Sequence, residues 1–327
     1  MDDVAKLAGV SAQTVSRAIG RPELVKEATR LAVQRAISQL NYIPNNVARD
    51  LASRRSHTVA VIIPTLATSV YAEEVNQIMA VLGSEGLTAL IGNSEFSIER
   101  EEQLIESFLQ RRPDGFILTG LKHSRRSRQL LRMSGAPVVE TWEADGSPLD
   151  MSVGFSNVAV GQAVGRSLIR QGYRRIGFVG GMFDTDTRSH QRYAGCASAL
   201  SEDGVEFAAV VELLVPMSSA DAIQGLDLAL AKDGALEAIF FSSDGLAIPA
   251  LLECQRRGID VPGRLAICGV GDYELAELVS PPLTTVRIET GKMGSSAATL
   301  ILQRLSGLKD IENRLDIGFE LIKRGST

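Results

Sequence analysis

Seven short apolar runs between residues 59 and 270 constrain the fold of this chain more than any other feature. Each run has four to six residues, and stretches of helical periodicity separate many of them. The runs are "VAVII" (59–63), "TALIG" (88–92), "GFILT" (115–119), "PVVE" (137–140), "RIGFVG" (175–180), "EAIFF" (237–241) and "LAICGV" (265–270). Strands that are apolar on both faces and joined through helices are typical of parallel sheets covered on both sides. This part of the chain is therefore predicted to be doubly wound α/β.

Amphipathic stretches with apolar residues three and four positions apart supply the helices. The clearest predicted helices cover residues 71–85, 100–110, 160–171, 190–201 and 246–257. A chain of 327 residues has room for about two domains and a small additional module.

Composition narrows the functional class. No apolar run approaches the roughly 20 residues that span a bilayer, and the first residues lack a signal-peptide pattern, so we expect a cytoplasmic protein and no membrane partner. The three cysteines, Cys196, Cys254 and Cys268, are too far apart for a metal motif or a disulfide framework. We interpret them as buried thiols in a reducing compartment.

Charge is distributed unevenly along the chain. Residues 1–57 contain nine Lys and Arg against five acidic residues, a net charge of +4, although the whole chain carries −5. A basic N-terminal head on an acidic body is typical of a polyanion partner such as DNA.

The head is predicted to begin with two short helices separated by a glycine turn. Asp3–Ala8 has helical periodicity, Gly9 suits a left-handed helix stop, and Ser11 is a favourable N-cap for a second helix ending near Ile19. A third helix is predicted over residues 26–40. The expected inward-facing side chains of the last two helices are Val10, Val15 and Ile19, and Leu31, Ala32, Ile37 and Leu40.

The second helix carries side chains suited to reading DNA. Gln13 and Arg17 lie four residues apart on one exposed face, together with Ala12. Gln can bond to adenine and Arg to guanine in the major groove, whereas hydroxyl groups suit phosphates. The predicted DNA-binding residues of this helix are Ser11, Ala12, Gln13, Thr14, Ser16 and Arg17. The alternative is a small helical cap with an ordinary polar face.

Residues 41–58, "NYIPNNVARDLASRRSHT", follow with a proline at a helix start. About ten helical residues are too few to be stable alone, so this segment is expected to fold when it gains a partner.

The head resembles the lactose-repressor (LacI/GalR) family of bacterial transcription regulators, on the blocks "DVAKLAGVS", "QTVSRAI", "LNYIPN" and "VARDLA". The resemblance implies a hinge helix that orders in the DNA minor groove and pairs with its copy across a homodimer. Leu51 is then the apolar wedge at the central base step, and Val47 and Ala48 pack hinge against hinge. The DNA-contacting set of this segment is Asn45, Val47, Ala48, Arg49 and Leu51.

Two departures from the family pattern stand in the head. Family members usually carry a Ser or Thr that caps the first helix, whereas this chain begins Met1-Asp2-Asp3, so that Asp2 or Asp3 could act as the cap. Ala12 is small and can contact little more than a thymine methyl group.

The resemblance extends over the body and implies the two-lobed fold of periplasmic sugar-binding proteins. The domains expected are a helix-turn-helix head (1–43), a hinge (44–57) and an effector-binding and dimerisation core (58–327). Lobe one is expected to cover about 58–156 and 287–309, and lobe two about 157–286 and 310–327.

A ligand of such a fold lies at the carboxyl ends of the strands, between the lobes. The residues that follow predicted strand ends are Val70, Tyr71, Trp142, Phe155, Arg188, Arg192, Ser243, Asp244 and Asp272. We predict that they form the effector site, although any one of the aromatic residues could be a core residue and either arginine a surface residue.

The body most resembles the gluconate-operon repressor branch of the family, on "RPELVKEA", "IPTLATSVYAEEV", "VGFSN", "LLECQRRGI" and "PPLTTVR". In many sugar-binding relatives an arginine near 190 and an Asp or Asn near 271 hold the sugar hydroxyls. His190 and Gly271 occupy these places here, which disfavours a neutral hexose. Arg188 could fork onto a carboxylate, so a sugar acid such as gluconate is favoured over a sugar phosphate.

No catalytic set is visible in the sequence. The three histidines, His57, His123 and His190, have no metal spacing, and neither a complete dinucleotide motif nor a phosphate loop is present. We therefore expect neither an enzyme nor a cofactor. A solute-binding receptor of the same fold would lack the DNA-binding head. The last residues, "FELIKRGST", carry no heptad pattern, which favours a dimer over a coiled-coil tetramer.

Overall fold

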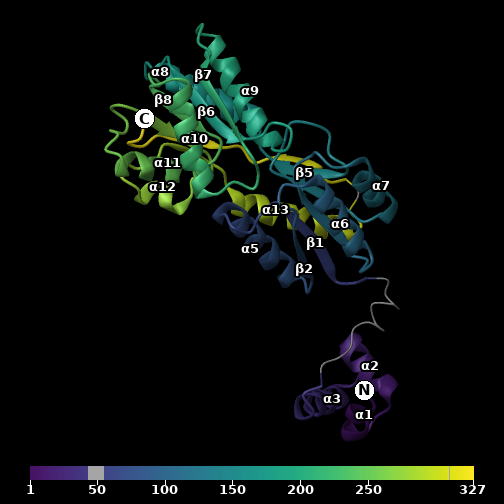
Figure 1. Ribbon diagram of the computed structural model, residues 1–327. Helices are drawn as coiled ribbons and strands as arrows, with labels where there is room; N and C mark the ends of the chain where they lie inside the picture. The colour runs from purple at the N-terminus through teal and green to yellow at the C-terminus, as the bar shows by residue number, and fades with distance from the viewer. Residues whose placement is uncertain (43–54, 309) are drawn as a thin grey trace. The chain divides into compact units, whose positions relative to one another are not determined.

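The computed structural model describes residues 1–42, 55–308 and 310–327. The chain divides into two compact units, Met1–Ser56 and His57–Thr327, which we call the head and the core. Figure 1 shows the head as a small group of helices and the core as a larger α/β body.

The head consists of α1 (Asp2–Ala8), α2 (Ala12–Gly20), a short 3₁₀ helix (Pro22–Leu24) and α3 (Glu27–Gln39). Its buried side chains are all small: Val4, Ala5, Val15, Ala18, Val33 and Ala36. Of the predicted inner stripe of the third helix, Ile37 packs against this cluster, but Leu31 and Leu40 do not. Leu31 and Leu40 are 43% and 44% exposed, because Val33 and Ala36, three residues apart, are the α3 side chains that face α1 and α2.

The turn between α1 and α2 forms as the sequence predicts. Gly9 ends α1 with φ +66° and ψ +33°, a left-handed conformation that glycine adopts at little cost. Ser11 caps α2, and its side-chain oxygen accepts a hydrogen bond from the Thr14 amide at 3.1 Å. Neither Asp2 nor Asp3 caps α1; both lie in its first turn, where the helix dipole favours negative charge.

The first lobe of the core is built on a six-stranded parallel sheet with the order β11-β5-β4-β3-β1-β2. Its strands are β1 (Thr58–Ile63), β2 (Thr88–Asn93), β3 (Gly115–Thr119), β4 (Val138–Thr141), β5 (Met151–Gly154) and β11 (Arg314–Asp316). Alternate residues of β1 face opposite sides of the sheet, as the period of a strand requires. Val59 and Val61 pack with α5 (Ser69–Ser84) and α13 (Thr290–Leu305). Ala60 and Ile62 pack with α6 (Ile98–Leu109) and α7 (Arg125–Ser134).

The second lobe contains a four-stranded parallel sheet with the order β7-β6-β8-β9. Its strands are β6 (Ile176–Gly181), β7 (Phe207–Leu213), β8 (Ala238–Phe241) and β9 (Ala266–Cys268). The helices α8 (Asn157–Arg170) and α9 (Thr187–Ser201) pack on one face, and α10 (Ser219–Lys232) and α11 (Asp244–Arg256) on the other. The short α12 (Glu274–Leu278) follows β9 (Figure 1). Both lobes are covered on two faces, which confirms the doubly wound α/β prediction.

In the described core the chain passes between the lobes three times: from β5 into α8, from β10 (Thr285–Arg287) into α13, and from β11 to β12 (Glu320–Ile322). Strands β10 and β12 pair antiparallel in a ladder of their own. One expected boundary differs from the structure. Residues 310–327 were grouped with lobe two, but β11 pairs with β5 and so belongs to the sheet of lobe one.

All seven apolar runs become strands, with ends shifted by up to two residues. The core also contains strands that apolar runs did not reveal: β5, β7, β10, β11 and β12. Strand β7 lies at the edge of its sheet and alternates buried and exposed residues, and β10, β11 and β12 have three residues each. Short or half-exposed strands of this kind leave no continuous apolar signal.

Among the described residues, no helix is long and apolar enough to span a bilayer.

Candidate functional site

The exposed face of α2 carries the polar side chains that the sequence assigned to DNA. Gln13, Ser16 and Arg17 are exposed, on the side of the helix away from Val15 and Ala18. The hydroxyl of Ser11 also bonds to that of Thr14, at 2.9 Å. Ala12 differs from the expectation: it is half-buried and packs against the head's own core. Asn45, Val47, Ala48, Arg49 and Leu51 lie outside the described residues.

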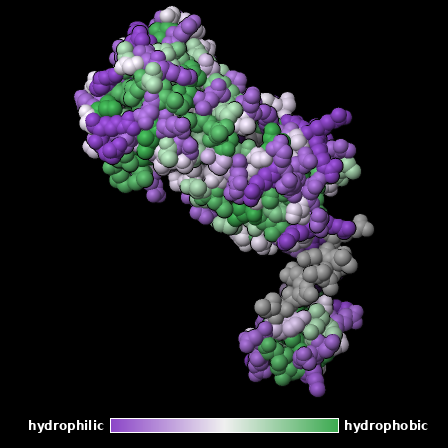
Figure 2. Space-filling view, viewed as in Figure 1, coloured by the Kyte–Doolittle hydropathy of each residue, from purple (hydrophilic) through white to green (hydrophobic). Residues whose placement is uncertain are grey.

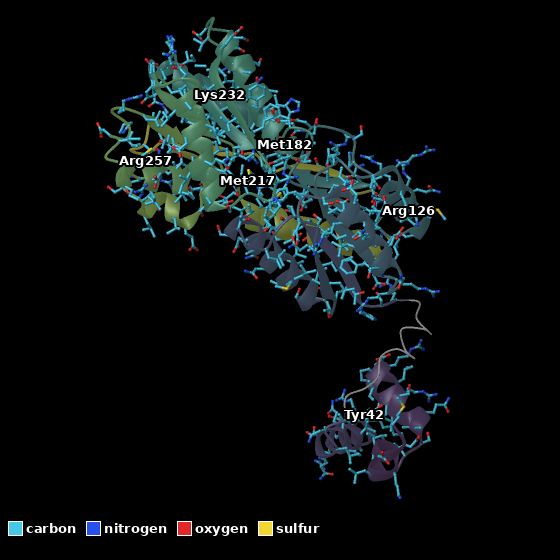
Figure 3. The ribbon with its side chains drawn as sticks, in the orientation of Figure 1. Tyr42, Arg126, Met182, Met217, Lys232 and Arg257 are labelled. Atoms are coloured by element: carbon cyan, nitrogen blue, oxygen red, sulfur yellow. The ribbon has the colours of Figure 1, made fainter. Side chains whose placement is uncertain are left out.

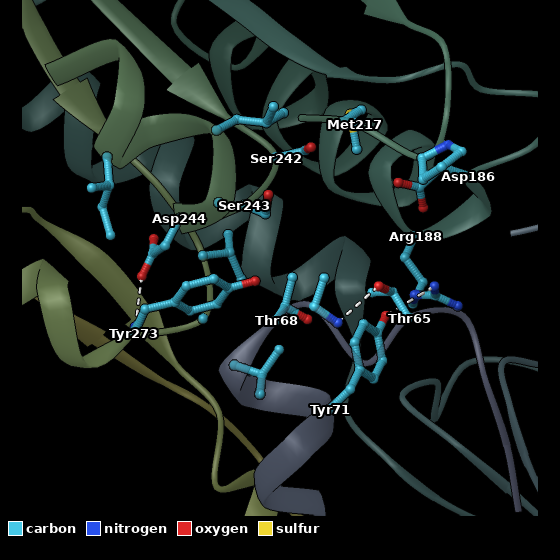
Figure 4. Close-up of a pocket in the computed structure, with 18 of the residues that line it drawn as sticks. Thr65, Thr68, Tyr71, Asp186, Arg188, Met217, Ser242, Ser243, Asp244 and Tyr273 are labelled. Carbon is cyan, nitrogen blue, oxygen red and sulfur yellow. Dashed lines mark hydrogen bonds between the residues drawn. The ribbon is translucent and has the colours of Figure 1, made fainter. Parts of the chain in front are cut away.

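A cleft of about 640 Å³ lies between the two lobes of the core. Its size is typical of a site for a small organic molecule. Lobe one contributes the loop after β1 and the start of α5, and lobe two contributes segments at or just beyond the ends of β6, β7, β8 and β9. Figure 4 shows side chains from both lobes pointing into this space.

Seven of the nine predicted effector residues line the cleft. They are Val70, Tyr71, Trp142, Arg188, Arg192, Ser243 and Asp244. They meet because parallel strands bring their carboxyl ends to one edge of each sheet.

Arg192 is 7% exposed and holds a fixed position in the wall of the cleft. Its Nε donates to Oδ1 of Asn157 at 2.8 Å, and its Nη1 donates to the carbonyl oxygen of Ser242 at 2.6 Å. Burial lowers the pKa of Arg192, and the nearby Asp186 partly offsets this. The family resemblance assigns His190 to the position of a sugar-binding arginine. In the structure, the His190 ring stacks on Phe183 with ring centroids 4.7 Å apart. An arginine near 190 is therefore present in the cleft, and it is Arg192.

Arg188 is the second buried guanidinium of the cleft and joins the two lobes. Its Nη2 donates to the Tyr71 hydroxyl at 3.3 Å, and its Nη1 lies 3.9 Å from Oε1 of Glu143. Burial acts to lower the pKa of Arg188, but Tyr71, Asp186 and Glu143 more than offset it and raise the pKa. Because Tyr71 and Glu143 belong to lobe one, the charge of Arg188 holds the lobes together at one end of the cleft.

Away from Arg188, the cleft is lined by hydroxyl groups. Figure 4 shows the Tyr273 hydroxyl directed toward the Thr68 side chain, with Ser242 and Ser243 nearby. The Thr68 hydroxyl is buried and forms no hydrogen bond of good geometry, although it lies close enough to the Tyr273 hydroxyl to act to lower the Tyr273 pKa. Tyr273 also explains the absence of a side chain at position 271, since a Cβ on Gly271 would lie 2.5 Å from the Tyr273 ring. The tyrosine thus occupies the space that an acidic residue at 271 would need.

Asp244 lies at the start of α11 beneath this hydroxyl-lined end and is completely buried. It accepts hydrogen bonds from the Thr285 hydroxyl at 2.7 Å and from the Tyr273 amide at 3.0 Å. Burial raises the pKa of Asp244 to about 7, although these two bonds act in the opposite direction. Asp244 therefore orients Tyr273, and a pKa of about 7 leaves its carboxyl about half neutral near neutral pH.

Two predicted effector residues are corrected. Phe155 is fully buried and packs edge-on against Trp142 with centroids 6.0 Å apart, so it supports the cleft wall without lining it. Asp272 lies outside the lining and binds Arg287 Nε and Arg324 Nη1, each at 2.7 Å. Its backbone has φ +49°, and this turn places the carboxylate between arginines of β10 and the segment after β12. Asp272 thus links β10 to the segment that follows β12.

Sequence reasoning missed several lining residues. The main ones are Thr65, Thr68, Phe96, Asp186, Met217, Ser218, Ser242 and Tyr273. Asp186 follows β6 and caps α9, so the strand-end argument applied to it and could have found it. Met217 and Ser218 follow β7, which the apolar runs did not reveal. Figure 3 labels Met217 beside the gap between the lobes.

Across the parts of the chain that the structure describes, no three His, Cys, Asp or Glu side chains are grouped to hold a metal ion. The cleft instead combines the two guanidinium groups of Arg188 and Arg192 with the neutral hydroxyls of Thr68, Ser242, Ser243 and Tyr273. This arrangement suits the binding of an anionic, hydroxylated molecule.

Comparisons with known proteins agree across the whole chain. The family model of the bacterial regulatory proteins of the lacI family matches residues 1–45, and a periplasmic binding protein-like domain matches residues 166–327. The HTH-type transcriptional regulator GntR of Pseudomonas aeruginosa is 37% identical over 330 residues, covering 100% of this chain and 95% of the relative.

Two solved structures share the fold over nearly the full length. A LacI-family transcriptional regulator from Silicibacter pomeroyi is 33% identical with a TM-score of 0.93, and the match covers 99% of this chain and 98% of the other. The lac repressor dimer bound to operator and the anti-inducer ONPF is 25% identical with a TM-score of 0.87, covering 99% and 97%.

Proposed function

Because the chain belongs to the lacI family of bacterial regulatory proteins, we propose that it acts as a dimeric repressor whose effector is a sugar acid, with D-gluconate as the favoured compound. The chain is a DNA-binding transcriptional regulator and its relatives are regulators, not enzymes. The proposal adds the class of effector, the residues that bind it and the cytoplasmic location in which it acts.

The pair of buried arginines carries this proposal. Arg188 and Arg192 bring two positive charges to the cleft. The lining contains the acidic residues Asp186 and Asp244, and Glu143 lies 3.9 Å from Arg188. A carboxylate accepts paired hydrogen bonds from guanidinium groups, and two buried cations need an anion to offset their desolvation. Asp186 and Glu143 offset part of the positive charge at Arg188, and a neutral sugar, unlike an anion, would add nothing to that compensation.

The hydroxyl-lined end supports a polyhydroxylated tail on the same molecule. A buried hydroxyl that makes no hydrogen bond costs about 1–3 kcal/mol. The Thr68 hydroxyl has only a poorly aligned contact with the Tyr273 hydroxyl, so a ligand hydroxyl would improve its pairing. The hydroxyls of a sugar acid would bond there while its carboxylate binds the arginines. A sugar phosphate is the alternative, since a phosphate also suits two arginines.

On DNA, we propose that α2 enters the major groove, with Gln13 and Arg17 at base edges and Ser11, Ala12, Thr14 and Ser16 beside the backbone or bases. By family resemblance, residues 44–57 form a hinge, with Leu51 as a minor-groove wedge beside Asn45, Val47, Ala48 and Arg49. Replacing Leu51 by Ala is expected to weaken operator binding strongly and leave effector binding intact. Unchanged operator affinity would refute the hinge assignment.

The first test is a titration of the full-length protein with D-gluconate, followed by the fluorescence of Trp142. Trp142 is the single tryptophan and lines the cleft. A saturable change, matched by calorimetry, is expected with D-gluconate and not with D-glucose. A response to glucose 6-phosphate alone would favour the sugar-phosphate alternative, and no response by either method would refute D-gluconate.

A matched pair of variants separates recognition from general charge effects. Arg188→Ala is expected to abolish the D-gluconate response, because it removes one of the two cations. Arg126→Ala removes an arginine that is 63% exposed on α7, at the outer end of lobe one (Figure 3), and should respond as wild type. An unaltered response in Arg188→Ala would refute its role.

The sign of regulation is measured with operator DNA. For an inducer, saturating D-gluconate lowers operator affinity, by a factor typical of allosteric coupling, about 5- to 150-fold. An increase in affinity would instead make D-gluconate a co-repressor.

A further inference from the structure

Trp142 combines a bulky side chain with a backbone conformation that such residues rarely adopt. It follows β4, is 4% exposed and has φ +72°, in the left-handed region. This conformation costs roughly 1–3 kcal/mol for a residue other than glycine and persists only when its surroundings enforce it. The contacts that hold Trp142 are therefore informative.

Two hydrogen bonds hold Trp142, one from each lobe. The indole Nε1 donates to Oε2 of Glu74 at 2.7 Å, and Glu74 belongs to α5 of lobe one. The Trp142 carbonyl oxygen accepts from Nδ2 of Asn157 at 2.9 Å, and Asn157 is the first residue of α8 in lobe two. One residue of the cleft wall is thus clamped between the two lobes.

The hydrogen bonds continue from Asn157 to the effector cleft. Oδ1 of Asn157 accepts from Nε of Arg192, and Nη1 of Arg192 donates to the Ser242 carbonyl oxygen at the end of β8. We call the continuous set Glu74, Trp142, Asn157 and Arg192 the relay. Trp142 and Arg192 line the cleft, whereas Glu74 and Asn157 lie behind it.

Close helix contacts make both ends of the relay stiff. A Cβ on Gly294 of α13 would lie 2.3 Å from the backbone oxygen of Glu74, so α5 and α13 touch at this point. A Cβ on Gly161 of α8 would lie 2.0 Å from the backbone oxygen of Arg192, so α8 and α9 touch in the same way. A displacement of Arg192 or Asn157 therefore cannot be absorbed by a loose helix at either end.

Glu74 is a costly residue for its position. It is completely buried, and its buried Oε1 makes no hydrogen bond of good geometry. Thr141 lies close enough to act with Trp142 against the rise in the Glu74 pKa that burial causes. Packing alone would favour an apolar side chain here, since an unsatisfied buried polar atom destabilises a fold. The hydrogen bond to Trp142 is the clearest interaction that the carboxyl makes.

We propose that the relay couples occupancy of the cleft to α5, with Glu74 and Asn157 as positioning residues that the effector does not touch. This inference rests on the proposed function, because it assumes that an anion binds Arg192. An anion that accepts from Arg192 competes with Asn157 for the guanidinium. The change reaches Trp142 through Asn157 and α5 through Glu74.

The test measures coupling, defined as the ratio of operator Kd with and without saturating D-gluconate, in the full-length protein. Glu74→Leu and Asn157→Ala are each expected to reduce the coupling at least fivefold relative to wild type, which is the lower end of typical allosteric coupling. Glu74→Gln keeps an oxygen acceptor for the indole and is expected to retain the coupling. Glu73→Gln, at the exposed neighbouring position of α5, is the matched control.

A purely structural role gives a different result. In that case Glu74→Leu and Asn157→Ala lower the melting temperature but keep the wild-type coupling ratio, and the proposal is overturned. If Glu74→Leu does not fold, Asn157→Ala decides the question by the same measurement.

A ligand-free measurement separates failure of the relay from failure of the proposed effector. Arg192→Ala is expected to shift the fluorescence emission of Trp142 when it is introduced into the wild-type protein. Introduced into the Asn157→Ala variant, the same substitution is expected to cause no further shift, because Asn157 transmits the effect. If D-gluconate is silent but this dependence is present, the effector is wrong and the relay stands. If Arg192→Ala shifts the emission equally in both backgrounds, the relay is overturned, whatever the effector.

Discussion

The head and the core differ in the size of the side chains that they bury. The head buries three valines and three alanines. The largest fully buried side chains of the core are phenylalanines, including Phe116, Phe178 and Phe240, and these pack within sheets covered on both faces. Exposed leucines occur on both units and do not distinguish them: Leu7 and Leu24 of the head are 50% and 59% exposed, and Leu214 and Leu278 of the core are 75% and 76% exposed. In Figure 2 the visible face of the head shows hydrophobic residues among hydrophilic ones.

This difference has an energetic meaning. Burial stabilises by about 25 cal/mol for each Å² of apolar surface removed from water, so alanines contribute much less than phenylalanines. Folded units near 40 residues are marginal without a partner or cross-link. The head is therefore expected to depend on DNA and on a second subunit, whereas the core is expected to be stable by itself.

The largest expected effect is a loss of folding stability in the core, caused by a substitution at a close contact between α8 and α9. Gly161→Val would place side-chain atoms against the Arg192 backbone oxygen, so the core should lose about 3 kcal/mol or more. Urea unfolding followed by Trp142 fluorescence measures this loss. Gly83→Ala, in α5 with open space around it, should leave the core equally stable or raise its stability by up to about 1 kcal/mol. A wild-type unfolding midpoint in Gly161→Val would contradict the packing.

A pH-dependent effect is expected in the core, where acids are buried; the described part of the head buries no charged side chain. Burial raises the pKa of Asp244 from 3.8 to about 7. The stability that its neutral form contributes is fully present below pH 3.8 and is lost as the pH rises through 7. The side chain in Asp244→Asn does not titrate. As the pH rises from 4 to 7, the unfolding free energy of this variant should therefore increase relative to that of wild type by up to about 1.4 kcal/mol per pH unit. A difference that is constant with pH would show that Asp244 is ionised throughout.

The third expected effect is a loss of operator binding, which depends on the head, without a change in effector binding by the core. Arg17→Ala removes an exposed side chain of α2 and is expected to weaken operator binding about 10- to 100-fold, as for the loss of one bidentate base contact. Gln34→Ala, on the exposed face of α3, is the control in a fluorescence-polarisation assay. D-Gluconate affinity should be the same in both variants. Equal operator affinities for Arg17→Ala and wild type would remove Arg17 from the interface.

The smallest expected effect is a loss of stability in the head at Gly9, where glycine is required by its backbone conformation and not, as at Gly161, by close packing. Gly9 has open space around it but adopts φ +66°, so Gly9→Ala should destabilise the head by about 1 kcal/mol through its backbone conformation. Amide hydrogen exchange of residues 1–42 should become faster, while the Trp142 unfolding transition of the core stays the same. Unchanged exchange in the head would mean that the turn tolerates a side chain.

The parts of the fold that follow a local pattern were predictable. The turn at Gly9, the Ser11 cap and the seven apolar strands depend on residues close together in sequence, and all formed as expected. The α3 stripe was not predictable, because Leu31 and Val33 are both apolar and only the approach of α1 and α2 decides which is buried. Strand β7 was missed because an edge strand needs only one apolar face.

The candidate site divides in the same way. The sequence alone determined that the chain is α/β with a helix-turn-helix head, and that residues after strand ends gather in one place, since parallel strands end at a common edge. It could not decide where each side chain at that edge points. Asp272 turns to Arg287 and Arg324, Phe155 supports the wall from behind, and Tyr273 fills the space beside Gly271. Those directions depend on partners far away in the chain, and only the tertiary structure brings the partners within bonding distance.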